Sequence, residues 1–171
     1  NRDAILAAMD LIALTLNSDR ITLTTVDPEH PDARACLAAY FQLLSEKIPG
    51  ISATHVPDPD PEAYAYRAPN GAFLLALADG LPIACGALKT LSPGIGEVKR
   101  LWVDPAARGQ GLARRMMRRL EDEARALGHT SLKLDTNENL PEAIALYRAD
   151  GWQETEPYTS FPATHWFAKT L

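Results

Sequence analysis

The sequence contains few of the residues that build metal sites and disulfides. Its 171 residues include two cysteines and four histidines. Cys36 and Cys85 match no metal or redox spacing, and no two histidines have the i, i+4 spacing of a helical metal site. We therefore predict no metal ion, and we expect both cysteines to be reduced, buried thiols of a cytoplasmic protein.

Excess positive charge and long apolar runs are also missing. The net charge of −5 argues against nonspecific binding of nucleic acid. The apolar segment 3–16 carries Asp10, has no signal-peptide cleavage pattern and is too short to cross a bilayer. We expect neither nucleic acid nor a membrane as a partner.

The two commoner phosphate-binding fingerprints are absent as well. The chain has no Gly-Lys-Ser/Thr of a nucleotide P-loop, and Gly109-Gln110-Gly111 is followed by Arg114 where G-x-G-x-x-G needs a glycine. The glycine pair nevertheless stands between a strand-like run at 97–103 and a long helical pattern. Free N–H groups at a helix start, and glycines that can take positive φ, suit a diphosphate. The alternative is an ordinary strand-to-helix turn.

Hydrophobic periodicity predicts a single α/β domain over residues 1–171, layered around a mixed sheet. Strands are predicted at 21–26, 73–78, 83–88, 97–103, 131–135, 152–156 and 165–170. Helices are predicted at 37–48, at about 106–127, and from an Asn139–Glu142 capping box to Gly151. Residues 51–70 contain closely spaced prolines, so we expect an irregular loop there.

An extra helix is predicted within residues 1–17, where Ile5, Met9, Ile12 and Leu16 fall at helical spacing. Its other face is apolar too, so the helix must be covered either by the core of this domain or by a partner subunit. Core packing is the favoured interpretation, and a homodimer stays open.

Two stretches together resemble one protein family. The order Arg-x-x-Gly-x-Ala at 108–113, after a strand, resembles motif A of the GNAT superfamily of acetyl-CoA-dependent N-acetyltransferases. Residues 142–152 resemble the second coenzyme-binding motif of that family, with Trp152 in place of the usual Phe. The resemblance is strongest over 71–171. It implies a mixed, mostly antiparallel sheet of about six to seven strands flanked by helices, here with the extra N-terminal helix.

The resemblance also implies where acetyl-CoA binds. The family has a V-shaped opening, here between the strands 97–103 and 131–135, in which the coenzyme arm lies like an additional strand. Backbone groups of Leu101, Trp102 and Val103 would bind the pantetheine and the thioester carbonyl. Many members have an Asn at the position of Leu140, and Asn137 or Asn139 would substitute for it here. The coenzyme diphosphate would be held by the turn comprising Arg108, Gly109, Gln110, Gly111, Leu112 and Ala113, with Arg114 beside it.

Acetyl transfer to an amine needs one group to accept the ammonium proton and another to protonate the leaving thiolate. Glu97 matches the family position of the proton acceptor, acting directly or through water. The alternative for Glu97 is a surface carboxylate paired with Lys99 or Lys133. Tyr147 matches the Tyr that often acts as the general acid near the coenzyme sulfur. Its alternative is a core tyrosine at helical spacing.

The sequence thus predicts an N-acetyltransferase that passes the acetyl group of acetyl-CoA directly to a primary amine of a small molecule or peptide. No covalent enzyme intermediate is expected. The alternative is a regulatory or sensor module that binds acyl-CoA without turnover. Asp58, Asp60 and Glu62 in the irregular loop hint weakly at a cationic acceptor.

Overall fold

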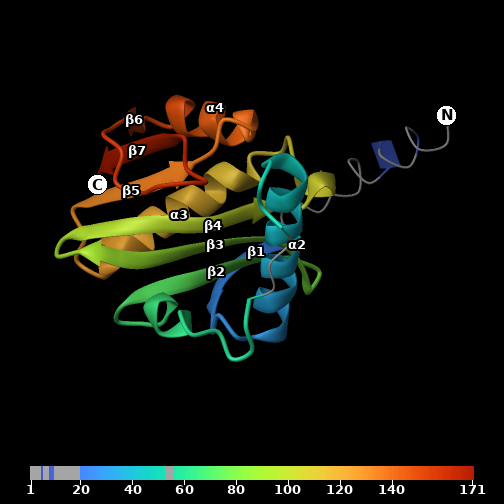
Figure 1. Ribbon diagram of the computed structural model, residues 1–171. Coiled ribbons are helices and arrows are strands. Elements are labelled where there is room, and N and C mark those ends of the chain that lie inside the picture. Colours follow the sequence, from blue (N-terminus) through green and yellow to red (C-terminus); the bar gives the residue numbers. More distant parts are fainter. Residues whose placement is uncertain (1–4, 6–7, 10–19, 53–55) are drawn as a thin grey trace.

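The computed structural model describes residues 5, 8–9, 20–52 and 56–171 (Figure 1). Apart from residues 5, 8 and 9, the predicted N-terminal helix lies outside the described residues. Of the helices within the described ranges, none combines the length and apolarity needed to cross a membrane.

A seven-stranded sheet with the strand order β1-β2-β3-β4-β5-β7-β6 forms the centre of the protein. All neighbouring strands are antiparallel except β4 and β5, which run parallel. This confirms the predicted mixed, mostly antiparallel sheet. The strands are β1 (Ile21–Val26), β2 (Gly71–Ala78), β3 (Leu81–Ser92), β4 (Ile95–Val103), β5 (Ser131–Thr136), β6 (Gln153–Glu154) and β7 (His165–Thr170). The helices are α2 (Pro31–Lys47), α3 (Leu112–Ala126) and α4 (Pro141–Ala149), with the 3-10 turns η2 (Ala63–Tyr66) and η3 (Pro105–Ala107).

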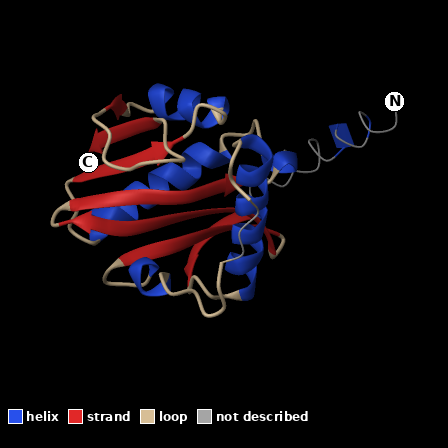
Figure 2. Ribbon diagram, in the orientation of Figure 1, coloured by secondary structure: helices blue, strands red, loops and turns tan. Residues whose placement is uncertain are grey.

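Strand alternation divides the core between the two faces of the sheet. Leu74 and Ala76 of β2 pack in the cluster that holds the apolar stripe of α3. Phe73 and Leu75, which alternate with them, pack in the cluster that holds Cys36 and Leu37 of α2. Because successive strand residues point to opposite faces, α2 and α3 cover opposite sides of the sheet, as Figure 2 shows. Cys36 and Cys85 are both buried and free, as predicted.

Helix α3 begins later than the sequence pattern predicts. Its stripe of Leu112, Met116, Leu120 and Ala124 is fully or nearly fully buried. The predicted start near residue 106 is wrong, because η3 ends at Ala107 and both following glycines have positive φ, 80° at Gly109 and 73° at Gly111. A right-handed helix cannot continue through such backbone angles, so α3 starts only at Leu112.

Two boundaries near the C-terminus also differ from the prediction. The Asn139–Glu142 capping box does not form, because Leu140 is the N-cap of α4 and makes no side-chain cap hydrogen bond. The chain turns earlier instead: Asn137 Oδ1 accepts a hydrogen bond from the Asn139 N–H, and Pro141 takes the first helical position. The predicted strand 152–156 shortens to β6, whose two residues pair with Phe167 and Ala168 of β7.

The parallel strands β4 and β5 diverge after a short contact. They pair only over residues 95–97 and 131–133, and the remainder of β4 has no partner on that edge in the described chain. A bulge lies just beyond the divergence, because Cys85 pairs with Trp102 while Ala87 pairs with Lys99. Within it, Arg100 has a φ of 57°. The V-shaped opening that the family resemblance implied is therefore present.

Candidate active site

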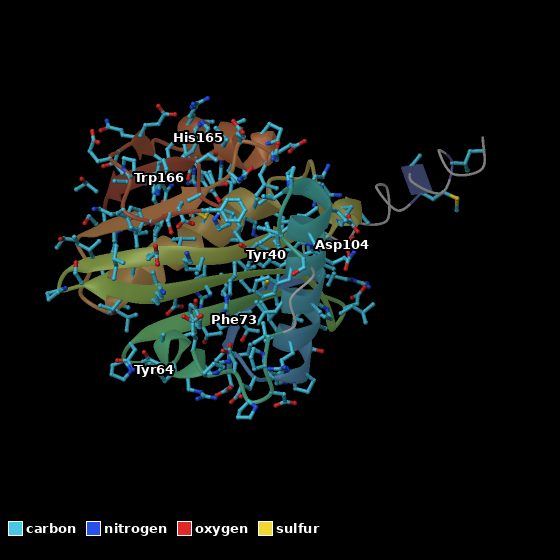
Figure 3. All side chains as sticks on the ribbon, viewed as in Figure 1. Tyr40, Tyr64, Phe73, Asp104, His165 and Trp166 are labelled. Carbon is cyan, nitrogen blue, oxygen red and sulfur yellow. The ribbon has the colours of Figure 1, made fainter. Side chains whose placement is uncertain are left out.

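A cavity lies where β4 and β5 diverge. Its polar lining comes mainly from the ends of the two strands and the turn after β5, and its apolar lining from α2 and α4. Figure 3 places Tyr40 on the α2 side and Trp166 on the opposite, β7 side of this region. The lining residues are Tyr40, Leu44, Ile48, Val98, Lys99, Arg100, Leu101, Asp135, Thr136, Asn137, Leu140, Ala143, Tyr147, Pro162 and Ala163.

Only part of the predicted site lines this cavity. Leu101, Asn137 and Tyr147 do, whereas Glu97, Trp102, Val103, Asn139 and the turn at 108–114 are outside its lining. Trp102 packs towards the α2 cluster and Val103 is buried in the α3 cluster. Their backbone nevertheless belongs to the unpaired edge of β4, so any contact with a ligand there comes from main-chain groups.

Tyr147 is a core residue that also lines the cavity. Its ring packs 6.1 Å from that of Trp152 and 5.8 Å from that of Phe167, centroid to centroid, so it belongs to the core. It also lines the cavity. Burial raises the pKa of the Tyr147 hydroxyl well above its ordinary value, and the charge of Asp135 adds to the effect. The phenol therefore stays protonated at neutral pH.

Glu97 is buried and lies outside the cavity lining, with its side chain 3% exposed. The hydroxyl of Tyr158 donates a hydrogen bond of 2.7 Å to Glu97 Oε2. Lys99 Nζ lies 3.9 Å from the same oxygen, and Lys89 Nζ lies 3.7 Å from Oε1. The alternative of a surface carboxylate is wrong as to position, although its pairing with Lys99 is present. Any proton that reaches Glu97 from the cavity needs an intermediate carrier.

The loop between β6 and β7 is hydrogen-bonded to Glu97 of β4 and to Asp135 of β5. Besides the Tyr158 contact, Thr159 donates a hydrogen bond of 2.7 Å from its hydroxyl to Asp135 Oδ2, and the Trp166 indole donates one of 2.8 Å to Thr159. Burial and the hydrogen bond to Glu97 raise the pKa of Tyr158 far above its ordinary value. Tyr158 thus stays a donor, which keeps this loop joined to β4.

Sequence reasoning missed two cavity residues for which a signal existed. Tyr40 stands at i, i+4, i+8 spacing with Leu44 and Ile48, so one helix face carries all three into the lining. Asp135 lies near the carboxyl end of a strand parallel to β4, where ligands of α/β sheets commonly bind.

Arg100 was also missed, and it explains the acidic residues of the irregular loop. Its guanidinium lies 3.4 Å from Asp60 Oδ2 and 3.2 Å from Glu62 Oε2. The same group stacks 4.6 Å from the Tyr66 ring centroid and 5.9 Å from that of Phe41. Asp60 and Glu62, two of the three carboxylates behind the suggested cationic acceptor, are therefore paired within the protein.

The turn after β4 has the features of an anion site. A Cβ added at Gly109 or Gly111 would meet no atom within 4 Å, so the backbone there is openly accessible. The buried Gln110 Nε2 has no hydrogen-bond partner among the described residues. Arg108 Nε donates to the Val103 carbonyl at 3.2 Å, which ties the turn to the end of β4. Arg114 Nε lies 3.6 Å from Asp150 Oδ1.

The two candidate asparagines have different environments. Asn137 is buried and both ends of its amide are engaged, with Nδ2 donating to the Pro162 carbonyl at 2.6 Å and Oδ1 accepting from Asn139 at 2.8 Å. Asn139 is exposed. The Asn137 side chain thus shapes the cavity wall by joining the β5–α4 turn to the loop before β7.

Comparisons with known proteins find a family model and sequence relatives that match this chain. The model of the acetyltransferase (GNAT) family matches residues 37–152. An IAA acetyltransferase of Azospirillum brasilense is 43% identical over 91 residues, which cover 53% of this chain and 60% of that protein. An uncharacterised N-acetyltransferase of Schizosaccharomyces pombe is 35% identical over 99 residues, 57% of this chain and 61% of its own. The chain thus spans about three fifths of the length of these relatives.

A solved structure extends the likeness at the level of the fold. YncA from Salmonella typhimurium, solved with its cofactor acetyl-CoA, superposes with a TM-score of 0.68 over 88% of this chain and 93% of its own. Its sequence identity is 16%, so it supports the fold alone.

Proposed function

The chain belongs to the acetyltransferase (GNAT) family, and we propose that it transfers the acetyl group of acetyl-CoA directly to a primary amine of a small molecule or peptide. The observation that carries the proposal is the opening between β4 and β5: one unpaired strand edge, a cavity that contains Tyr147, and an accessible glycine turn at the end of the same strand. All three features lie along β4 or in the turn that follows it.

The residues present fit acetyl-CoA. The N–H groups at the start of α3 lack intrahelical partners, and the helix dipole adds partial positive charge, so residues 108–113 would hold the diphosphate. Gln110 Nε2, which has no hydrogen-bond partner in the described part of the chain, offers a further donor. Main-chain groups of residues 101–103 would hold the pantetheine arm, as an added strand does at a sheet edge.

When bound, acetyl-CoA supplies an acetyl thioester activated for attack. The acceptor must lose a proton before its nitrogen can form the new C–N bond, and the C–S bond breaks as the acetyl group moves. Glu97 is the proposed final acceptor of that proton, through water, because its carboxylate lies outside the cavity lining. Tyr147 is the proposed donor to the departing thiolate, since burial keeps its hydroxyl protonated.

Free-thiol release tests the proposal. The protein is incubated with acetyl-CoA and a panel of amines, amino acids, polyamines, aminoglycosides and peptides, and the thiol is followed with a disulfide dye. We expect release that depends on the acceptor. In Tyr147→Phe, kcat should fall about 100-fold, in the range typical of a lost general acid.

Two controls separate chemistry from binding. Tyr64→Phe alters an exposed tyrosine away from the cavity and should keep full activity. Calorimetry should show unchanged acetyl-CoA affinity in Tyr147→Phe. If acetyl-CoA binds but no acceptor releases thiol, the protein is instead an acyl-CoA-binding regulatory module. Full activity in Tyr147→Phe would remove Tyr147 from the mechanism.

A further inference from the structure

Five charged side chains form an ordered array on the face of the sheet that α2 covers. In one row, Lys89 of β3, Glu97 of β4 and Lys133 of β5 are register partners across three strands. Two residues further along β4 and β5, Lys99 and Asp135 form a second pair, with Lys99 Nζ 3.5 Å from Asp135 Oδ1. Neighbours in register share a face, so all five charges belong to one surface.

This array has one cation more than it has anions. Lys89 and Lys99 both lie near Glu97, and Lys99 also pairs with Asp135. Within the described part of the chain, Lys133 makes no ion pair, and its Nζ lies 5.3 Å from the centre of the Tyr158 ring. The nearby Arg100 contacts two carboxylates, Asp60 and Glu62, so these three side chains together carry one net negative charge. The four cations and four anions of the array and the Arg100 group therefore balance. An acceptor that carries both an ammonium and a carboxylate keeps this balance, whereas a purely cationic acceptor adds an uncompensated positive charge.

The second row is the part of the array that reaches the cavity. Lys99 and Asp135 both line it, whereas Glu97, Lys89 and Lys133 do not. A molecule whose ammonium and carboxylate are joined by one carbon can bind between Lys99 and Asp135, with its ammonium against Asp135 and its carboxylate against Lys99. Asp135 lines the same cavity as Tyr147, the proposed general acid. The wall opposite consists of Tyr40, Leu44 and Ile48, which suits an apolar substituent.

On the basis of the proposed function, we propose that the acceptor is an α-amino acid with an apolar side chain. Its ammonium binds Asp135, its carboxylate binds Lys99, and its side chain lies against α2. Lys99 is thus the residue that determines specificity for carboxylate-bearing amines. Lys89 acts as a positioning residue, because its contact with Glu97 leaves Lys99 free to turn towards the substrate.

Matched acceptors test this assignment. Leucine, leucine methyl ester and isoamylamine share the amine and the apolar chain, but only leucine carries a carboxylate. With the wild-type protein, we expect KM for leucine to be about 10- to 100-fold below that for either analogue, because a charged hydrogen bond typically contributes a factor of this size. Lys99→Met keeps the length of the side chain without its charge. It should raise KM for leucine by a similar factor and leave KM for isoamylamine nearly unchanged.

The control is Lys47→Met, which alters an exposed lysine in the last turn of α2 and should keep the preference for leucine. Equal or better turnover of isoamylamine or a polyamine would overturn the assignment while the acetyltransferase proposal stands. Absence of thiol release with every amine would instead contradict the proposed function. Calorimetry with leucine then still decides this inference: binding lost in Lys99→Met supports it, and no binding to the wild type refutes it.

Discussion

The anchoring of Arg100 leads to a stability prediction that separates two physical effects at one position. Its side chain is 10% exposed and pairs with the carboxylate of Asp60, which is 3% exposed. Arg100→Ala removes the cation and leaves a buried carboxylate without its partner, a loss that typically costs about 3–5 kcal/mol. The stacking on Tyr66 and Phe41 is lost as well.

Substitution of Arg100 by glycine should recover part of that loss of stability, because the backbone at this position has a conformation that favours glycine. Arg100 has a φ of 57°, a conformation that costs an L-residue about 1–2 kcal/mol and glycine almost nothing. We therefore expect Arg100→Gly to be more stable than Arg100→Ala by about 1 kcal/mol, although both are less stable than the wild type.

Urea unfolding followed by circular dichroism measures the three free energies. Arg148→Ala, which removes an exposed ion pair with Glu154, is the control and should change little. If Arg100→Gly is no more stable than Arg100→Ala, backbone strain is absent from the bulge. If both variants lie within about 1 kcal/mol of the wild type, the buried ion pair does not hold the irregular loop against β4.

Three further perturbations test the glycine turn at residues 108–113, the hydrogen bond from the β6–β7 loop to Glu97, and the buried His129. Gly111→Ala places a residue with a Cβ at a φ of 73° and should weaken acetyl-CoA binding in calorimetry. The control Gly128→Ala, at a φ of 85° beyond the end of α3, should leave the affinity unchanged. Equal affinities of the two variants would contradict a coenzyme role for the turn at residues 108–113. Tyr158→Phe leaves Glu97 with one donor fewer and should lower the free energy of unfolding by about 1–3 kcal/mol in urea titrations, and an unchanged midpoint would show that the hydrogen bond is not formed. Burial lowers the pKa of His129, so the unfolded chain binds a proton there first, and the free energy of unfolding should fall as the pH drops below about 6.5. His129→Gln should reduce that slope between pH 7 and 5, and an identical slope would refute the assignment.

Periodicity and turn chemistry in the sequence were sufficient to predict most of the fold. Alternating apolar residues predicted β1 with its observed bounds, and the stripe at Leu112, Met116, Leu120 and Ala124 predicted the buried face of α3. Two of the errors occurred where a single local interaction decides a boundary. Asn139 looked like a cap, but its N–H is bound by Asn137, and the positive φ of two glycines delayed the start of α3.

The candidate site was only partly predictable because its members meet through the tertiary fold. The contact between Arg100 and Asp60 joins residues 40 positions apart, and that between Tyr158 and Glu97 joins residues 61 apart. Neither spacing carries a local signal. The charge array also depends on strand register across β3, β4 and β5, which the sequence does not specify. By contrast, Tyr147 and the glycine turn belong to continuous motifs, and they could be proposed from the sequence.

Hydrogen–deuterium exchange of the protein with and without acetyl-CoA tests the central claim most directly. Backbone amides of residues 98–103 and 109–114 are expected to exchange more slowly with the coenzyme bound, because the first group lies on the unpaired edge of β4 and the second at the start of α3. Residues of β1, far from the opening in the strand order, should be unaffected. Unchanged exchange in both segments at saturating acetyl-CoA, or protection confined to other parts of the chain, would contradict the coenzyme site described above.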